Sequence, residues 1–163
     1  SDGKNKSEVL EEFFSYLHDA FGPKKIPISA DLFGMTTTNT DDLNIGQVLE
    51  KALPYFDFIA PMVYPSHYPP GFMGFKNPAA KPYEVVFHSM EKAAERASTT
   101  PLKLRPWLQD FDLGATYTAD MVRAQMKATY DAGLTSWMLW DASNRYTKDA
   151  LLPESIGPGA SAE

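Results

Sequence analysis

The sequence predicts an α/β fold, a parallel (β/α) half-barrel that makes up half of a (β/α)8 barrel. Four amphipathic helical patterns alternate with four short apolar runs along the chain. No Asn-Gly hairpin signal joins any two of the apolar runs. Strands that alternate with helices in this way pair in parallel through right-handed crossovers.

The first two units have a clear helical or strand pattern. Apolar residues three and four apart predict a helix over 7–21, which Ser7 can cap. The run 26–33 is too short and too apolar for another helix, so we expect a buried strand. The next unit has an expected helix over 44–53 and an expected strand over 56–64.

The last two units repeat this order. A helix is expected over 83–97 and a strand over 104–111. A second helix is expected over 118–132, where Gly133 ends it, and a last strand over 134–141. Four strands covered by helices on one face leave the other face open, as the interior of an eight-stranded barrel. A missing half, a second copy or a misplaced helix must cover that face.

The links between elements are uneven in length. The links that follow strands are long, over 34–43, 65–82 and 112–117, whereas most links that precede strands are short. In barrels and doubly wound sheets the loops after the strands build the active face. Function is therefore expected at the carboxyl ends of the strands.

Composition limits the class of protein. A chain of 163 residues that is 44% hydrophobic is long enough for one domain, with a core over about 7–150 and a polar tail over 151–163. A net charge of −6 without a basic run argues against a nucleic-acid partner. No apolar stretch is long enough to span a membrane, and no cysteine is present. The compartment stays open, with secretion or the cell envelope expected if a leader precedes the chain.

Alternation along the strands places polar and aromatic side chains on the inner face. We expect Asp31, Tyr64, Gln109 and Trp140 at the last inward position of the four strands, with Trp107 close by. Sugar rings stack on indoles and phenols, and amides and carboxylates bond sugar hydroxyls. This ring of side chains therefore suits a carbohydrate.

Three carboxylates at strand ends are candidates for catalysis. Cleavage of a glycosidic bond requires an acid for the leaving oxygen and a carboxylate beside the developing oxocarbenium ion. Asp31, Asp110 and Asp141 lie at the expected strand ends. Taken singly, each is also explained as a helix cap, an ion-pair partner or a loop residue, so both interpretations stay open.

The histidines offer one further candidate. His67, in the long loop after the second strand, can bond a sugar hydroxyl or orient an acid, or it is simply a solvated loop residue. Three scattered histidines without cysteine argue against a transition-metal site. The stretch 71–74 lacks the lysine and the helix of a phosphate-binding loop. We expect no metal and no cofactor.

Four ordered motifs, over 28–34, 59–65, 105–111 and 137–144, carry a family resemblance. The chain resembles the bacterial family described as "putative glycosyl hydrolase domain", a TIM-barrel group, over about 7–150. More distantly, Met62, Tyr64 and Trp140 are similar to features of family 18 glycoside hydrolases. The resemblance implies a barrel that acts on carbohydrate. We include Asn144, which ends the fourth motif, among the expected sugar contacts.

The resemblance also implies which half is present. In that family an aspartate-bearing Phe-Asp-Tyr-Ile-Arg-Phe-Pro motif closes the fourth strand, and this chain has no such segment. The visible strands therefore correspond to strands five to eight. Three hypotheses follow: an incomplete glycoside hydrolase, a non-catalytic carbohydrate-binding or scaffold module, and a half-barrel that pairs with an N-terminal half or with a second copy as a homodimer.

Overall fold

The computed structural model describes residues 3–151, and it contains one four-stranded sheet in the order β1-β2-β3-β4. The strands are β1 Ser29–Phe33, β2 Phe58–Met62, β3 Trp107–Gln109 and β4 Met138–Trp140. All three neighbouring pairs are parallel. The predicted half-barrel topology is therefore confirmed, although each strand is shorter than expected. The predicted tail lies outside the described residues from position 152 onward.

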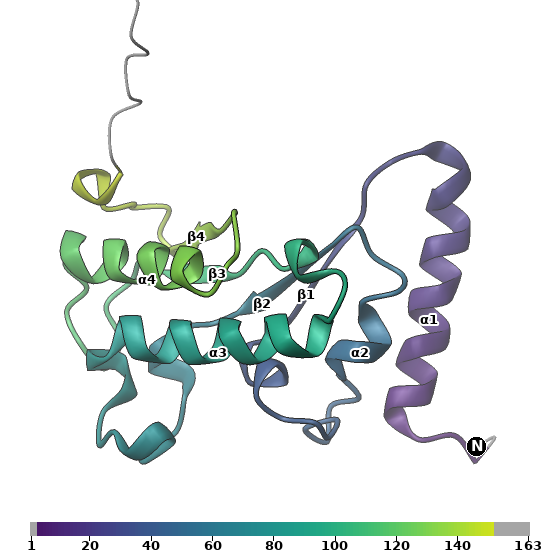
Figure 1. Cartoon of the computed structure of the whole chain (residues 1–163), viewed down its shortest axis with the longest axis horizontal. Coiled ribbons are helices and arrows are strands. Elements are labelled where there is room, and N and C mark those ends of the chain that lie inside the picture. The colour runs from purple at the N-terminus through teal and green to yellow at the C-terminus, as the bar shows by residue number, and fades with distance from the viewer. Residues whose placement is uncertain (1–2, 152–163) are drawn as a thin grey trace, which may run out of the picture.

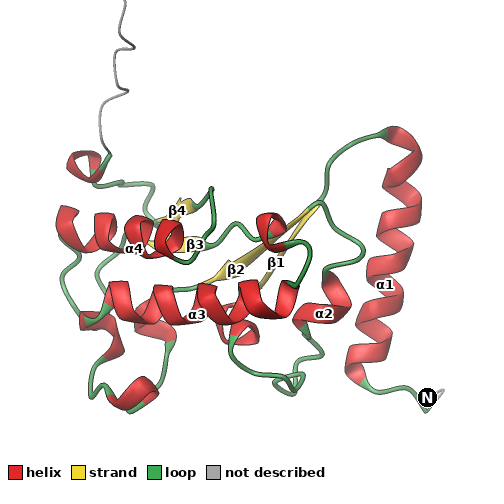
Figure 2. Ribbon diagram, viewed as in Figure 1, coloured by secondary structure: helices red, strands yellow, loops and turns green. Residues whose placement is uncertain are grey.

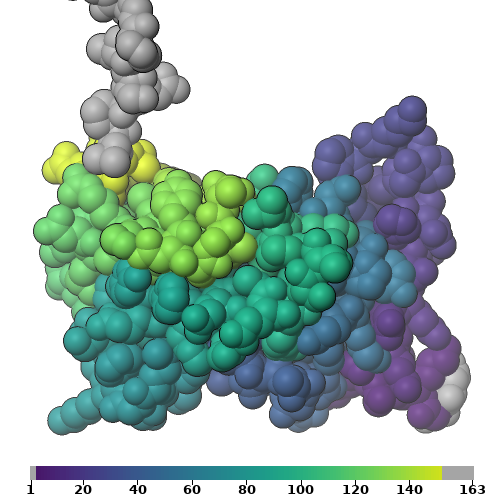
Figure 3. All heavy atoms as spheres, in the orientation of Figure 1, coloured from purple at the N-terminus to yellow at the C-terminus, as the bar shows by residue number. Residues whose placement is uncertain are grey.

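One α-helix precedes β1 and the others connect the strands. They are α1 Lys6–Phe21, α2 Leu49–Ala52, α3 Pro82–Ala97 and α4 Ala119–Asp131. Helices α3 and α4 lie side by side across one side of the sheet, and α1 lies beyond α2 at one end of the molecule (Figure 1). Figure 2 shows the same arrangement with the strands behind these helices. In the space-filling view from this side, atoms of the middle and later parts of the chain, drawn in teal and green, form most of the visible surface (Figure 3).

Helix α1 begins one residue earlier than expected and has a different cap. The Asn5 side chain accepts the backbone N–H of Glu8 at 3.0 Å, and the Glu8 carboxylate accepts the backbone N–H of Asn5 at 2.8 Å. This reciprocal pair is a capping box. The predicted Ser7 cap is wrong, because Ser7 lies inside the helix and is buried. The predicted cap of α4 is confirmed, since Thr118 accepts the backbone N–H of Met121.

The second helix is much shorter than predicted. It begins at Leu49, because Asn44 and Gly46 before it adopt left-handed backbone conformations, with φ of 56° and 84°. Lys6 of α1 fixes this turn through its ammonium group, which binds the backbone and side-chain oxygens of Asn44 at 2.7 and 3.0 Å. A Cβ on Gly46 would lie 2.9 Å from the Lys6 carbonyl oxygen. The turn and α1 therefore stabilise each other, and the turn replaces the first five residues of the predicted helix, 44–48.

The two faces of the sheet differ in cover. Leu32, Ile59 and Leu108 face the helices and are at most 1% exposed. The residues that alternate with them lie on the opposite side, which we call the open face: Ser29, Asp31, Phe33, Phe58, Ala60, Met62, Arg105, Trp107, Gln109, Met138 and Trp140, of which Ala60 and Gln109 are buried. On this face the side chains of Phe33 and Trp140 are 46% and 42% exposed. Parallel sheets are normally covered on both faces, so the open face is the unusual surface of this molecule.

No helix in the described range 3–151 is long and apolar enough to cross a lipid bilayer.

Candidate functional site

A carboxylate and two indoles form a row across the open face. The indole N–H of Trp107 donates to Oδ1 of Asp31 at 3.0 Å. The ring of Trp140 meets that of Trp107 edge to face, with centroids 5.9 Å apart and an interplanar angle of 80°. Asp31 and Trp140 are both exposed. The row thus joins β1, β3 and β4 and presents a carboxylate, with one oxygen fixed by an indole N–H, together with two indole rings.

The sheet register changes the expected order of this row. Phe33, and not Asp31, is level with Met62, which in turn is level with Trp107. Asp31 lies two residues deeper, level with Ala60. The inferred common level of the four predicted residues was therefore wrong for β1. Phe33 is an open-face residue that the sequence analysis missed, although its two-residue spacing from Asp31 was a sufficient signal.

Tyr64 lies at the carboxyl end of β2 within an aromatic cluster. Its ring packs edge-on against those of His67 and Phe111, with centroids 5.3 and 5.5 Å away. Burial raises the pKa of the Tyr64 phenol well above its usual range, and the negative charges of Asp31 and of an ionised Tyr146 add to this effect. The raised pKa favours the neutral phenol, which can donate a hydrogen bond to a ligand.

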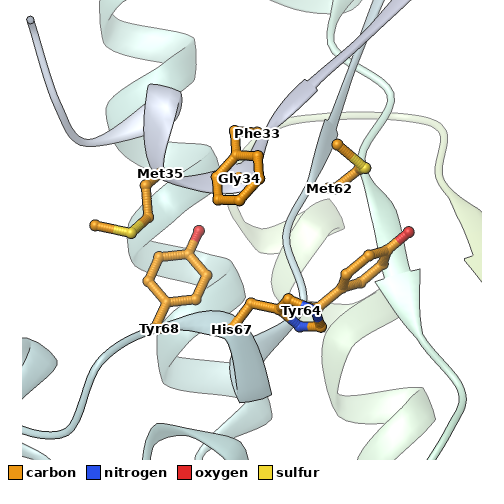
Figure 4. A pocket seen from close by; sticks show the side chains of 7 residues that line it. All are labelled: Phe33, Gly34, Met35, Met62, Tyr64, His67 and Tyr68. Atoms are coloured by element: carbon orange, nitrogen blue, oxygen red, sulfur yellow. The ribbon is translucent and has the colours of Figure 1, made fainter. Parts of the chain in front are cut away.

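A small cavity opens between the loops after β1 and β2. It has a volume of about 130 Å³, and its lining is mainly apolar and aromatic. Figure 4 shows the seven lining residues, Phe33, Gly34, Met35, Met62, Tyr64, His67 and Tyr68. His67 is exposed, and its Nδ1 lies 3.1 Å from the Ser66 hydroxyl. The expected Tyr64 and His67 are thus brought together, and the cavity lies next to the open face.

The segment that follows the cavity residues Phe33, Gly34 and Met35 is held by Arg96, in the last turn of α3. Its Nη1 donates to the backbone carbonyls of Thr36, Thr37 and Asn39 at 2.5, 3.1 and 2.8 Å. Its Nε and Nη2 bind the two carboxylate oxygens of Glu50 at 2.7 and 2.6 Å. One guanidinium therefore holds the turn after β1 to two helices.

Gln109 is brought to the strand end but faces other protein groups. Its side chain is fully buried. Its Oε1 accepts the backbone N–H of Ser66 at 3.1 Å, and its Nε2 donates to the Phe111 carbonyl at 2.9 Å. In this structure Gln109 connects the loops after β2 and β3, and its expected contact with a sugar stays a prediction.

Asp110 and Asp141 follow adjacent strands and are both buried. Oδ1 of Asp141 accepts the backbone N–H groups of Ser143 and Arg145 at 2.6 and 3.3 Å. Oδ2 of Asp110 accepts that of Thr147 at 2.8 Å. Both carboxylates therefore face the loop after β4, whereas Asp31 faces the open side. The expected Asn144 lies in that same loop and is exposed.

The chemical capacity of the site follows from these groups. It offers one exposed carboxylate, two indoles, a protonated phenol and an imidazole, all at the open face or the carboxyl ends of the strands. Within the described residues no group of three or more His, Asp or Glu side chains is arranged to hold a metal ion. Flat apolar rings beside hydrogen-bonding groups suit a ligand with both polar and apolar faces.

These features define the chain as a half-barrel of the TIM-like class, with its candidate site at the carboxyl ends of four parallel strands. The chain belongs to the family described as "Putative glycosyl hydrolase domain", whose pattern matches residues 1–146. The expected family resemblance is therefore confirmed. No curated protein matches the chain.

A solved structure supports the fold. The glycoside hydrolase domain of PgaB (BpsB) from Bordetella bronchiseptica is similar to this chain with a TM-score of 0.59 and 20% sequence identity. The similarity covers 83% of this chain and 37% of that chain. At this identity the likeness concerns the fold alone. This chain thus spans well under half of the length of the solved domain.

Proposed function

We propose that this chain is the part of a glycoside hydrolase-like barrel that supplies strands five to eight, and that it binds carbohydrate at the open face. We also propose that residues 1–163 form a single domain with its core over about 7–150. The row formed by Asp31, Trp107 and Trp140 is the observation that carries it. Sugars present a flat apolar face to aromatic rings while their hydroxyls bond a neighbouring carboxylate, which is what this row provides.

Asp31 has the central chemical role in the proposal. The bond from Trp107 fixes one of its oxygens and leaves the other for a sugar hydroxyl, for a developing positive charge at the anomeric carbon, or for proton transfer. Trp140 and Tyr64 supply aromatic contacts, and His67, Gln109 and Asn144 supply further hydrogen bonds. Asp110 and Asp141 stay predictions as catalytic carboxylates.

The test uses binding first and hydrolysis second. Calorimetric titration of the chain with the pentasaccharides of cellulose, chitin, starch and xylan should detect binding of at least one. Trp140→Ala should weaken that binding by about 3- to 10-fold through loss of ring contact. Asp31→Asn is measured in the same titrations and in the hydrolysis test below. Its matched control is Asp19→Asn, a change on the exposed side of α1.

Hydrolysis requires a protein in which the barrel is complete. In such a protein Asp31→Asn should lower cleavage of a chromogenic glycoside by about 100-fold or more, the usual effect of losing an acid or base. Undiminished cleavage would exclude Asp31 from catalysis and leave it a binding residue.

A non-catalytic carbohydrate-binding or scaffold module is the second candidate function. Glycoside hydrolases generally use two carboxylates that flank the scissile bond. Of the three candidate carboxylates only Asp31 faces the open side, since Asp110 and Asp141 bond the loop after β4. Sugar binding without turnover by a completed barrel would support this second function over the first.

The open face itself supports a proposal about partners. Helix α1 presents Val9, Phe13 and Tyr16 to solvent, each more than half exposed, on the β1 side of the sheet. Beside α4, a hollow lined by Tyr130, Trp137 and Leu151 among others lies on the β4 side. Two open strand edges, two apolar flanks and an open face together fit a second four-stranded half-barrel. We propose that an N-terminal half of the same barrel or a second copy of the chain supplies it.

A further inference from the structure

The loop after β4 is held more firmly than an ordinary surface loop. Its backbone N–H groups at Ser143, Arg145 and Thr147 all donate to buried carboxylates. The acceptors are Asp141, which is 8% exposed, and Asp110, which is 3% exposed. Hydrogen bonds to charged acceptors shielded from water are stronger than neutral ones. We call residues 143–147 the braced loop.

The backbone of the braced loop turns sharply between its two supports. Asn144 has a φ of 55°, a left-handed conformation that asparagine tolerates better than most residues, and its N–H donates to the Asp141 carbonyl at 3.1 Å. The two carboxylates follow neighbouring residues of paired strands, since Gln109 is level with Trp140. The supports therefore belong to the sheet, and the loop takes its position from the sheet.

Tyr146 lies between the last two bonded amides and has no role in the core. It is 39% exposed, and the bonds of Arg145 to Asp141 and of Thr147 to Asp110 hold it at the carboxyl ends of β3 and β4. An exposed aromatic residue on a fixed loop loses little conformational freedom on binding a ligand.

We propose that the braced loop is a preformed part of the ligand site, that Asp110 and Asp141 are its positioning residues, and that Tyr146 contacts the carbohydrate bound at the open face. The proposal rests on the proposed function for the identity of the ligand, but the positioning of the loop stands on hydrogen bonds alone. In this proposal both buried carboxylates accept backbone N–H groups of the braced loop, a role that requires no contact with substrate. Sequence patterns gave no signal for Tyr146, because it follows the last recognisable motif.

The first experiment measures amide hydrogen exchange in the full chain by NMR. Asp141→Ala should speed exchange at Ser143 and Arg145, and Asp110→Ala should speed it at Thr147, each by about 5- to 10-fold, while Leu108 in β3 stays protected. Asp141→Asn and Asp110→Asn keep a side-chain carbonyl oxygen as acceptor but lose its charge, so they should restore slow exchange in part. The recovery should be smaller for Asp110→Asn, because its amide nitrogen would take the buried position of Oδ1, which has no hydrogen-bond partner in the described part of the chain. Unchanged exchange in the alanine variants would overturn the positioning role.

The second experiment measures binding of the same four pentasaccharides. Tyr146→Ala should weaken binding by about 3- to 10-fold, while Tyr16→Ala, which removes an exposed tyrosine from α1, should leave it unchanged. Equal binding by Tyr146→Ala and wild type would overturn the contact. If the wild type bound none of the sugars, the proposed function and the role of Tyr146 would both fail, and the exchange result would still decide whether the carboxylates position the loop.

Discussion

Gly34 is the residue at which the turn after β1 approaches strand β2. A Cβ built on it would lie 2.3 Å from the carbonyl oxygen of Met62 and 3.2 Å from the hydroxyl of Tyr68. Backbone atoms of a strand cannot move away as a flexible side chain can. Glycine is therefore needed here for close approach, and the cavity wall in Figure 4 depends on it.

Replacing Gly34 should destabilise the fold and deform the cavity. Gly34→Ala should lower the free energy of unfolding by about 1–3 kcal/mol, the usual cost of overpacking, as measured by urea denaturation. Gly22→Ala is the control, because Gly22 has no atom within 4 Å of a Cβ other than its chain neighbours and no left-handed conformation. That variant should stay within about 0.5 kcal/mol of wild type. Equal stability of the two variants would show that β2 can yield at Met62.

At the residue scale the sequence predicted which side chains lie on the open face better than it predicted what each side chain contacts. The alternation rule correctly placed Asp31, Trp107 and Trp140 on one face, because side chains in a strand point alternately to its two faces. It also placed Gln109 on that face, but it did not predict that the amide is bonded to the backbone of two loops. The contact with Ser66 joins positions 43 residues apart and depends on loop conformation, which local patterns do not encode.

Among the elements, α3 has a role beyond its cover of the sheet. Arg96 in its last turn binds three carbonyl oxygens of the segment after β1. Thr36 and Thr37, which supply two of these, are fully buried. Their carbonyls would lose this partner if the guanidinium were removed, and unpaired buried acceptors are costly. Helix α3 therefore holds the segment that directly follows the cavity residues Phe33, Gly34 and Met35.

Arg96→Met should lower the free energy of unfolding by about 2–3 kcal/mol, because it removes the donors from these carbonyls and keeps the apolar stem. Arg96→Lys should recover part of that loss, since one ammonium cannot reproduce the planar fork. Urea denaturation of both variants is the measurement. A fully stable Arg96→Met variant would mean that water replaces the guanidinium without cost.

Glu50→Gln is the control that separates the ion pair from the carbonyl contacts. Its side chain is 48% exposed, so its loss should cost less than about 1 kcal/mol. The hydrogen bond from Arg96 lowers the pKa of the Glu50 carboxyl. The contribution of the pair is therefore present above the unfolded pKa, about 4.5, and is lost as pH falls through the lower folded pKa. The acid side of the stability curve should be less steep in Glu50→Gln.

Helix boundaries were predictable where caps and periodicity agreed. The two long helices after β2 and β3 begin and end within a residue of the predicted positions, helped by Thr118 and by Gly133 with its φ of 85°. The second helix was overestimated because Lys6, 38 positions from Asn44, fixes the turn before it. A long-range contact decided that element, and no window of local sequence contains both partners.

The whole molecule is defined by a sheet that is covered on one side. Phe33 and Trp140 keep 46% and 42% of their surface exposed on the open face. Exposed apolar surface that extends over several strands marks an interaction surface. The parallel order of the strands was predictable from the alternation of strands and helices. What covers the open face was not predictable, because that partner is not specified by contacts within these residues.

The isolated chain offers a direct test of the second copy as the cover. If two copies close one barrel, light scattering should show a mass that rises with concentration toward twice 18.1 kDa. Trp140→Lys places a charge on the open face, and burying an unpaired charge is costly. The concentration at which half of the chains are dimeric should therefore be at least about 10-fold higher in this variant. Leu102→Lys, at a site that is 57% exposed beside the opposite end of β3, should not shift it. A chain that stays monomeric at every concentration would exclude the homodimer, and the cover would then have to come from a different four-stranded half, such as the N-terminal half of the same barrel.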